Sequence, residues 1–486
     1  MDDFDVVVVG GGINGTGLAR DLAGRGWRVL LAEAQDLAQH TSSSSTKLIH
    51  GGLRYLETYE FSLVAKALQE REVLLRSAPH IIRPLRFVLP HAPHLRPAWM
   101  IRIGLFLYDH LARRELLPGS QGLRLTGTAY GAALRPEFTR GFVYSDGWVD
   151  DARCVVLNAM DARQRGAEVL TRCAVTETRR DAEAWRVTLA GGRQVRSRAL
   201  VNAAGPWAES FLRGQRLPAR GMRLVKGSHI VVPQRFAHDH AYIFQAPDGR
   251  IIFAIPYEGR FTLIGTTDVE LPHDAAPPGR AEISAAETAY LCEQASRYLA
   301  QPVRPQDVVW SYAGVRPLLD EGGSASSVTR DYLLEADAQG GAPLLNVWGG
   351  KLTTYRKLAE DGASQLGRML GDARRPWTRG ARLPGGDLGP HGVDLAAFTR
   401  ALQACHAGRP PQLVARLAHA YGSGADALLA APPGAEVAPG LFEAELHHLV
   451  EQEWARSAED VLWRRSKLGL HYTAAQRAAV ADWMKG

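Results

Sequence analysis

Three glycines near the N-terminus have the spacing of a phosphate-binding turn. Residues 6–9 are four valines, and Gly10, Gly12 and Gly15 follow them in a G-x-G-x-x-G pattern. The first glycine permits a tight turn, the second lets a pyrophosphate approach the backbone, and the third lets a helix pack closely on a strand. Glu33 ends a second apolar run, where a carboxylate holds ribose hydroxyls. This order predicts a dinucleotide site, and an acid at this point favours NAD or FAD over NADP.

Hydroxyl and cationic side chains are concentrated in the segment Thr41–Tyr55. Four serines at 42–45 and two glycines at 51–52 would allow a planar ring to approach closely. Lys47 and Arg54 are candidate contacts for an anion. The alternative is a polar loop whose hydroxyls bond only to nearby backbone groups.

A second glycine-rich turn, Gly349–Thr354, joins a predicted strand to a predicted helix and carries Lys351. A helix N-terminus with a lysine stabilises negative charge, and a reduced flavin carries such charge near N1 and O2. The turn therefore favours a flavin over a nicotinamide, with an ordinary helix start as the alternative.

Further candidates for chemistry are scattered through the second half of the chain. His229 ends the stretch Lys226–His229, Arg316 lies between a glycine and a proline, and Arg330 precedes Asp331 and Tyr332. A single histidine is more often structural than catalytic, and a single arginine more often forms a surface ion pair. Several cations around one pocket would instead indicate a phosphorylated or carboxylated substrate.

The elements that must position these residues are readable from periodicity and turn signals. Helices are expected at 61–76 and 352–370, and strands at 169–176, 199–202, 226–233, 251–256, 261–267 and 344–348. Asp-Gly at 248–249 and Glu-Gly at 258–259 mark turns, so the strands around them are expected to be antiparallel. Beyond a linker near 378–390 the chain is expected to be helical, with capping-box patterns at 457–460 and 473–476.

Length and composition limit the class of protein. A chain of 486 residues with 46% hydrophobic residues is expected to form two or three folded domains. Four cysteines lack metal or redox spacing, so we expect structural thiols in a reducing compartment and no metal site. No secretory signal is recognised at the start of the chain, and no window is apolar enough to span a bilayer. The net charge of +6 suits an anionic substrate, an anionic membrane face or nucleic acid.

One stretch has the character of a membrane-surface helix. Residues 96–114 contain Trp99, Phe106 and other large apolar residues, with Arg102, Asp109 and Arg113 as a narrow polar stripe. The stretch is either an interfacial helix or a buried core helix.

The chain resembles the FAD-dependent glycerol-3-phosphate dehydrogenases. The matching stretches run in order along most of the sequence: VVVGGGINGTG (7–17), the segment 33–57, HLRPAWMIRIGLFLYDHL (94–111), YSDGWVDDAR (144–153), VNAAGPWAE (201–209), KGSHIVVP (226–233), IGTTDVE (264–270), YAGVRPL (312–318), TRDY (329–332), GGKLTTYRKLAE (349–360) and the segment 443–469. The resemblance implies an α/β FAD-binding domain, Rossmann-like and of the glutathione-reductase or D-amino-acid-oxidase type, with an inserted antiparallel β-sheet substrate domain and an α-helical C-terminal domain. We expect the first to span 1–385, with the insert at about 75–150 and 215–335, and the C-terminal domain to span 386–486.

The resemblance also implies a reaction and a set of site residues. The family oxidises sn-glycerol 3-phosphate to dihydroxyacetone phosphate by hydride transfer from C2 to N5 of FAD, and passes the electrons to a membrane quinone. Arg54 and Arg330 would bind the phosphate, with Tyr55 and His50 also at the substrate. Arg316 would hold the C2 oxygen, His229 is the leading candidate for the base, and Lys351 would lie by the flavin. The implied FAD contacts are Gly10, Gly12, Ile13, Asn14, Gly15, Glu33, Thr41, Ser42, Ser43, Lys47, Leu48, Val175, Ala204, Gly205, Gly314, Gly350, Lys351, Leu352, Thr353 and Thr354.

The resemblance further implies peripheral attachment to an anionic membrane, at the cytoplasmic face of the inner membrane, and leaves a homodimer open. One rival is an amine, amino-acid or hydroxy-acid oxidase of the same fold. Another is a flavoprotein that binds nucleic acid, but we expect no such partner because the basic residues are dispersed, without interleaved aromatics.

Overall fold

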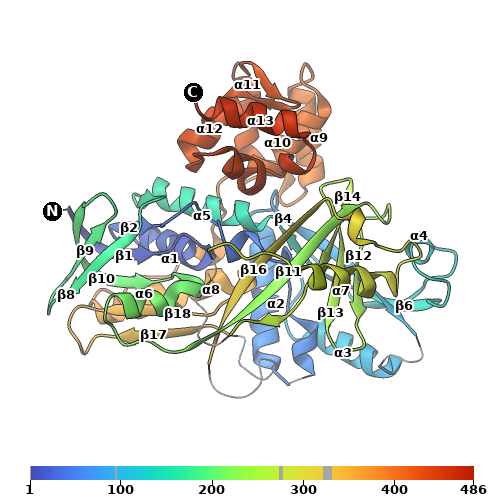
Figure 1. Ribbon diagram of the computed structural model, residues 1–486, viewed down its shortest axis with the longest axis horizontal. Helices are drawn as coiled ribbons and strands as arrows, with labels where there is room; N and C mark the ends of the chain where they lie inside the picture. Colours follow the sequence, from blue (N-terminus) through green and yellow to red (C-terminus); the bar gives the residue numbers. More distant parts are fainter. Residues whose placement is uncertain (1, 58, 93–95, 273–276, 278, 321–330) are drawn as a thin grey trace.

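The computed structural model describes residues 2–57, 59–92, 96–272, 277, 279–320 and 331–486. Two domains, each built around one large sheet, lie side by side, and a C-terminal domain lies over helix α5 (Figure 1). The predicted fold class is therefore confirmed. The predicted domain boundaries stay a prediction.

The first sheet is built on β1, whose four valines are buried on both faces, as expected of a central parallel strand. Its described strands run in the order β17 (Leu333–Asp337), β18 (Leu344–Trp348), β10 (Gln194–Asn202), β1 (Asp2–Val9), β2 (Val29–Ala32) and β7 (Glu168–Leu170). β9 (Trp185–Leu189) pairs antiparallel with β10, and β8 (Val175–Arg180) pairs with β9.

Helices cover one face of this sheet. α1 (Ile13–Gly24) packs between α5 (Asp151–Gln164) and α8 (Tyr355–Met369), and together they bury Val6 and Val8 of β1. Val7 and Val9 point to the other face, which α6 (Ala208–Gly214) and β9 cover. The carboxyl end of β1 thus points the glycine turn toward the boundary with the second domain (Figure 1).

The strand predicted at 169–176 is wrong as a single element. β7 ends at Leu170 and β8 begins at Val175. Arg172 between them has φ +53°, and its N–H donates to the Gln35 carbonyl at 2.7 Å. This local turn interrupts the strand and ties it to the loop after β2.

The second sheet is mostly antiparallel, and its strands come from two separate parts of the chain. Its described order is β15 (Val269–Glu270), β11 (Met222–Pro233), β14 (Phe261–Gly265), β13 (Ile251–Tyr257), β12 (Ala241–Gln245), β4 (Ile82–His91), β6 (Arg140–Val149) and β3 (Leu48–Ile49). β16 (Trp310–Leu319) also pairs with β11, β5 (Gln121–Arg124) pairs with β6, and β12 runs parallel to β4. The helices of this part are α2 (Phe61–Ser77), α3 (Ala98–His110), α4 (Ala129–Ala132) and α7 (Ala285–Ser296).

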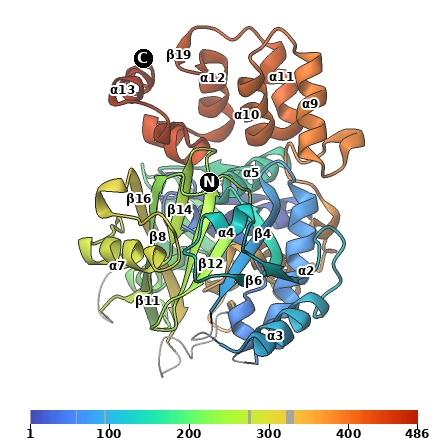
Figure 2. The ribbon, with the colours of Figure 1, turned by 90° about the vertical axis from the view of Figure 1, so that its right-hand side faces the viewer.

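Helix α3 is not a core helix. It buries Leu105 and Tyr108, whereas Trp99, Met100, Ile103 and Phe106 are each about half exposed or more. It lies at the end of the molecule opposite the C-terminal domain (Figure 2). Among the described residues, no helix has both the length and the apolar character needed to cross a bilayer.

The C-terminal domain is helical, as predicted, but also contains a short hairpin, β19 (Glu436–Ala438) and β20 (Leu441–Phe442). Its helices are α9 (Leu395–Cys405), α10 (Pro411–Tyr421), α11 (Ala425–Ala430), α12 (Glu443–Glu453), the π-helix η9 (Asp460–Arg465) and α13 (Ala474–Trp483). Both predicted capping boxes form, and Asp460 replaces the usual glutamate in the first of them.

Candidate active site

The glycine turn after β1 has no room for side chains. Gly10 has φ +107°, and a Cβ there would lie 2.5 Å from the Ala203 carbonyl oxygen. A Cβ on Gly15 would lie 1.9 Å from the Gly10 carbonyl oxygen. Gly12 is the N-cap of α1 and, with Ile13 and Asn14, lines a cavity of about 520 Å³, so the start of that helix faces the cavity. The Ile13 N–H donates to the Ser42 hydroxyl at 3.0 Å.

Glu33, which is predicted to hold ribose hydroxyls, lies at the wall of this first cavity. Its carboxylate accepts hydrogen bonds from the N–H groups of Gly11, at 2.5 Å, and Gln35, at 2.7 Å. Burial raises the pKa of Glu33, and these two N–H groups oppose the rise. The carboxylate is thus fixed at the turn, and its role toward ribose hydroxyls stays a prediction.

A second cavity of about 270 Å³ continues from the first. The two share the lining residues Ile13, Thr41, Ser42, Pro317, Gly349 and Gly350, so they form one channel. η1 (Thr41–Ser43), β11 and β16 form its walls together with the turn before η5 (Leu352–Thr354). The channel runs from the glycine turn to the boundary between the two sheets.

The turn Gly349–Lys351 is held close to the first glycine turn. Gly349 and Gly350 both have positive φ, and the Asn14 side chain donates to the Gly349 carbonyl at 3.1 Å. Lys351 places its Nζ 4.1 Å from the centre of the Tyr55 ring, at the second cavity. A cation and the start of a helix therefore meet there.

Most of the predicted cofactor contacts line this channel. Those that do are Gly10, Gly12, Ile13, Asn14, Glu33, Thr41, Ser42, Leu48, Val175, Ala204, Gly205, Gly314, Gly350, Lys351, Leu352 and Thr353. Gly15, Ser43 and Thr354 lie behind the lining.

The prediction of Lys47 as an anion contact is wrong. Its Nζ is buried and pairs with Asp151 at 2.7 Å, and it also donates to the Ser43 carbonyl. Asp151 begins α5 and accepts a further hydrogen bond from the Ser45 hydroxyl. Lys47 therefore orders the serine loop from behind, and its ammonium group is paired with Asp151 instead of lining the channel.

His229 is buried on β11 at the second cavity. Its ring stacks on Tyr312 at 4.8 Å, and its Nε2 lies 2.9 Å from the Thr46 hydroxyl. Burial lowers the pKa of His229 to about 3, and the charges of Lys47 and Arg316 act in the same direction. The imidazole is therefore neutral near pH 7, and its Nδ1 has no hydrogen-bond partner among the described residues.

Arginines gather at a third cavity of about 130 Å³, which adjoins the second. Arg54, Arg250 and Arg316 line it, together with His50 and Tyr55. Arg316 Nη2 donates to Asp268 at 2.8 Å. Burial lowers the pKa of His50, with Lys351 and Arg71 in support and Asp146 opposed. This concentration of positive charge suits an anionic ligand. Arg330 lies outside the described residues.

Several residues that line this cavity were not predicted, among them Arg250, Thr266 and Asp268. Thr266 and Asp268 belong to the IGTTDVE stretch, for which the resemblance to the family implies no role. Arg250 follows an Asp-Gly turn, and nothing in its local sequence distinguishes it from a surface arginine. The antiparallel pairing of β13 with β14 brings these residues together.

The channel fits a flavin dinucleotide. The glycine turn leaves space and N–H groups for a pyrophosphate, and the Asn14 side-chain oxygen is buried without a partner in the described part of the chain. The Lys351 turn would stabilise charge at the flavin end.

Comparison with known proteins identifies the class. A family model described as FAD dependent oxidoreductase matches residues 5–356, and one described as the C-terminal domain of alpha-glycerophosphate oxidase matches 377–485. The chain belongs to the FAD-dependent oxidoreductases, and FAD is its cofactor.

Full-length relatives narrow this class. A glycerol-3-phosphate dehydrogenase of Pseudomonas aeruginosa is 51% identical, over 99% of this chain and 95% of the relative. A D-erythritol 1-phosphate dehydrogenase of Brucella abortus is 48% identical, over 99% and 97%. The structure of a glycerol-3-phosphate dehydrogenase from Bacillus halodurans complexed with FAD has a TM-score of 0.79 and 29% identity, over 99% of this chain and 90% of that one. Within its class, the chain is a member of the glycerol-3-phosphate dehydrogenase family.

Proposed function

We propose that the protein oxidises the secondary alcohol of sn-glycerol 3-phosphate to dihydroxyacetone phosphate. The observation that carries this proposal is the arginine-lined cavity beside the flavin end of the channel. A phosphate dianion would pair with Arg54 there, and with Arg330 by resemblance to the family. The substrate carbons would then lie between these cations and the channel.

The remaining roles follow from charge and position. FAD, when bound, supplies the acceptor for the hydride that leaves C2. Arg316 would hold the C2 oxygen as negative charge develops on it, while Asp268 fixes the guanidinium. His229 would take the hydroxyl proton because its ring is neutral and lies at the second cavity. Its lowered pKa makes it a weak base, so the adjacent Arg316 must lower the pKa of the alcohol.

A longer polyol phosphate is a second candidate substrate. The Brucella relative named for D-erythritol 1-phosphate is almost as similar as the Pseudomonas one. In addition, Arg250 and Phe253 line the third cavity together with Arg316, and space beside them would accommodate additional carbons.

Anaerobic flavin bleaching separates the candidates. The holoenzyme is mixed with glycerol 3-phosphate, D-erythritol 1-phosphate or glycine, and the flavin spectrum is followed. We expect glycerol 3-phosphate to bleach the flavin fastest. Bleaching by glycine alone would favour an amino-acid oxidase, and salt-dependent RNA retention without bleaching would favour a nucleic-acid-binding flavoprotein.

Two variants test the assigned roles. Arg330→Ala should raise the half-saturating substrate concentration steeply and leave the FAD content intact, whereas loss of FAD would make Arg330 structural. His229→Ala should slow flavin reduction and change its dependence on pH. Unchanged reduction rates across pH would remove His229 as the base.

We also propose that electrons pass to a membrane quinone and that α3 attaches the protein peripherally to the cytoplasmic face of the inner membrane. The exposed apolar side chains of α3 support this proposal, as do Arg102 and Arg113 nearby, which suit anionic lipid.

A further inference from the structure

The loop that follows β2 forms one wall of the cofactor channel. Every residue from Glu33 to Ser42 except Leu37 lines the first cavity. The hydrogen bonds within the loop join near neighbours in sequence, from the Asp36 N–H to the Gln39 side chain and from the Gln39 N–H to the Asp36 carbonyl. Ala38 has φ +59°, an unfavourable conformation for a residue with a Cβ, so contacts from elsewhere must hold the loop in place.

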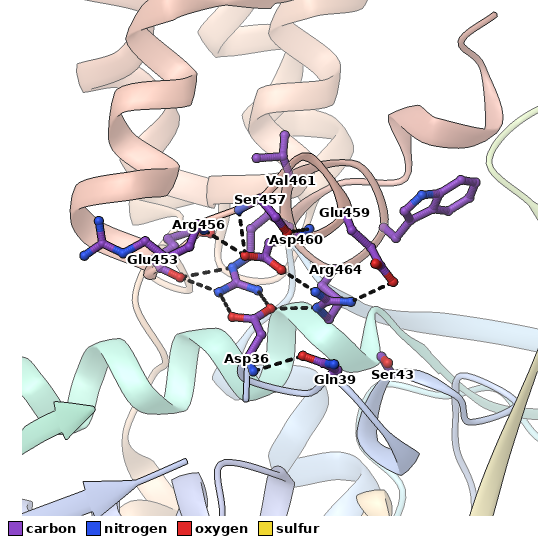
Figure 3. Close-up of polar contacts among 12 residues, drawn as sticks. Asp36, Gln39, Ser43, Glu453, Arg456, Ser457, Glu459, Asp460, Val461 and Arg464 are labelled. Carbon is purple, nitrogen blue, oxygen red and sulfur yellow. Dashed lines mark hydrogen bonds and ion pairs between the residues drawn. The ribbon is translucent and has the colours of Figure 1, made fainter. Parts of the chain in front are cut away.

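The first domain supplies some of those contacts, since the Ala38 N–H donates to the Gly11 carbonyl and the Arg172 N–H to the Gln35 carbonyl, and the C-terminal domain supplies buried charged ones. Asp36, which is fully buried, receives two hydrogen bonds from Arg465, at 2.6 and 2.7 Å, and one from Arg464, at 2.6 Å. Figure 3 shows Asp36 rising from the loop toward Arg464 and Asp460. The bidentate arrangement with Arg465 fixes both the position and the orientation of the carboxylate. We call these three residues, Asp36, Arg464 and Arg465, the Asp36 clamp.

The two arginines of the clamp are themselves held rigidly. They end the π-helix η9, and from these consecutive positions both reach the Asp36 carboxylate. Arg464 pairs with the buried Asp460, and Arg465 donates to the Glu453 carbonyl at 2.6 Å. Burial acts to raise the pKa of Glu453, but Arg153 and His448 outweigh it and lower that pKa to about 2. Glu453 therefore stays ionised and paired with Arg153 of α5.

From this geometry we infer that Arg464 and Arg465 are positioning residues for FAD, and that the C-terminal domain forms part of the cofactor site. They act on FAD through Asp36 and the loop Glu33–Ser42, with no contact to the reacting atoms. Loss of the clamp should release the loop wall and speed FAD dissociation.

The experiment measures the rate at which FAD is released from the holoenzyme. No substrate is present, so the result does not depend on the proposed reaction. Purified Arg465→Gln, Arg465→Lys and Asp36→Asn are diluted, and the fluorescence of released FAD is recorded over time. We expect release at least tenfold faster than in the wild type for Arg465→Gln and Asp36→Asn. Arg465→Lys keeps the positive charge but loses the paired hydrogen bonds, so its rate of FAD release should lie between those of the wild type and of Arg465→Gln.

A matched control separates cofactor positioning from general weakening of the C-terminal domain. Glu445 accepts two hydrogen bonds from Arg416, at 2.7 and 2.6 Å, inside that domain and away from the loop. Glu445→Gln should lower the melting temperature and leave FAD release within twofold of wild type. Equal acceleration in Glu445→Gln, or wild-type release in folded Asp36→Asn, would overturn the inference. Asp36→Asn preserves side-chain shape and decides the question if Arg465→Gln does not fold.

Discussion

The membrane assignment gives a prediction whose size follows from the structure. Trp99 is 64% exposed and Phe106 is 55% exposed on one face of α3. With about 150–250 Å² for a whole aromatic side chain, the two present about 270 Å² of apolar surface together. At ~25 cal/mol/Å², its burial in lipid would contribute about 7 kcal/mol as an upper bound. If only half of this area enters the lipid, Trp99→Glu with Phe106→Glu should still lower vesicle binding by at least roughly a hundredfold.

The assay is cosedimentation with vesicles that contain phosphatidylglycerol, with far-ultraviolet circular dichroism and FAD content as checks on folding. Val309 and Val393 are exposed apolar residues away from α3, at 53% and 38%. The matched control Val309→Glu with Val393→Glu should therefore sediment like the wild type. If the Trp99 and Phe106 double variant also sediments fully while folded, α3 is not the attachment site.

Three further predictions concern single side chains. Tyr108→Phe removes a hydroxyl that accepts a hydrogen bond from the Gly51 N–H at 2.7 Å and donates one to Asp146 at 2.8 Å. This substitution should lower the free energy of unfolding by about 1–3 kcal/mol and raise KM for the substrate. An unchanged KM would contradict a link between Tyr108 and the substrate site. Burial, assisted by Arg153 and His419, lowers the pKa of His80 to about 3, so below its ordinary pKa of about 6.5 the unfolded chain binds a proton that the folded chain does not. The free energy of unfolding should therefore decrease as the pH is lowered from about 6 to about 4. In urea titrations, His80→Leu should reduce the slope of this free energy against pH by about 1.4 kcal/mol per pH unit, and equal slopes for the variant and the wild type would refute the argument. Lys351→Met should lower the flavin reduction potential by about 30 mV, equivalent to about 1.4 kcal/mol for two electrons, as measured by dye equilibration, and an unchanged potential would place the lysine outside the charge-stabilising role.

The dinucleotide end of the site was predictable because its signals are local. Gly10, Gly12 and Glu33 lie within one strand–helix–strand unit, and each residue type answers a steric or hydrogen-bonding need of that unit. The end of α2 and the capping box at Thr473 are likewise set by neighbours in sequence.

The predictions that failed concern partners distant in sequence. Lys47 has the positive charge expected of an anion contact, but its ammonium group pairs with Asp151, which is 104 residues away in the sequence. The break between β7 and β8 depends on Gln35. The pairing of Arg316 with Asp268, on which no prediction was made, likewise depends on strand packing around β11. Periodicity and propensity carry no information on such pairings, which only the assembled fold brings about.

Different elements hold the substrate-binding and the FAD-binding parts of the site in place. The inner face of α3 holds the substrate side, because Tyr108 bonds to Gly51 in the segment that carries His50 and Arg54. The C-terminal domain, at the opposite end of the molecule, holds the cofactor loop through Asp36 (Figure 2). Attachment of α3 to a membrane would therefore act first on the substrate-binding segment and leave the FAD loop undisturbed. It follows that damage to the clamp should appear as cofactor loss, whereas damage to α3 should appear in KM or in vesicle binding.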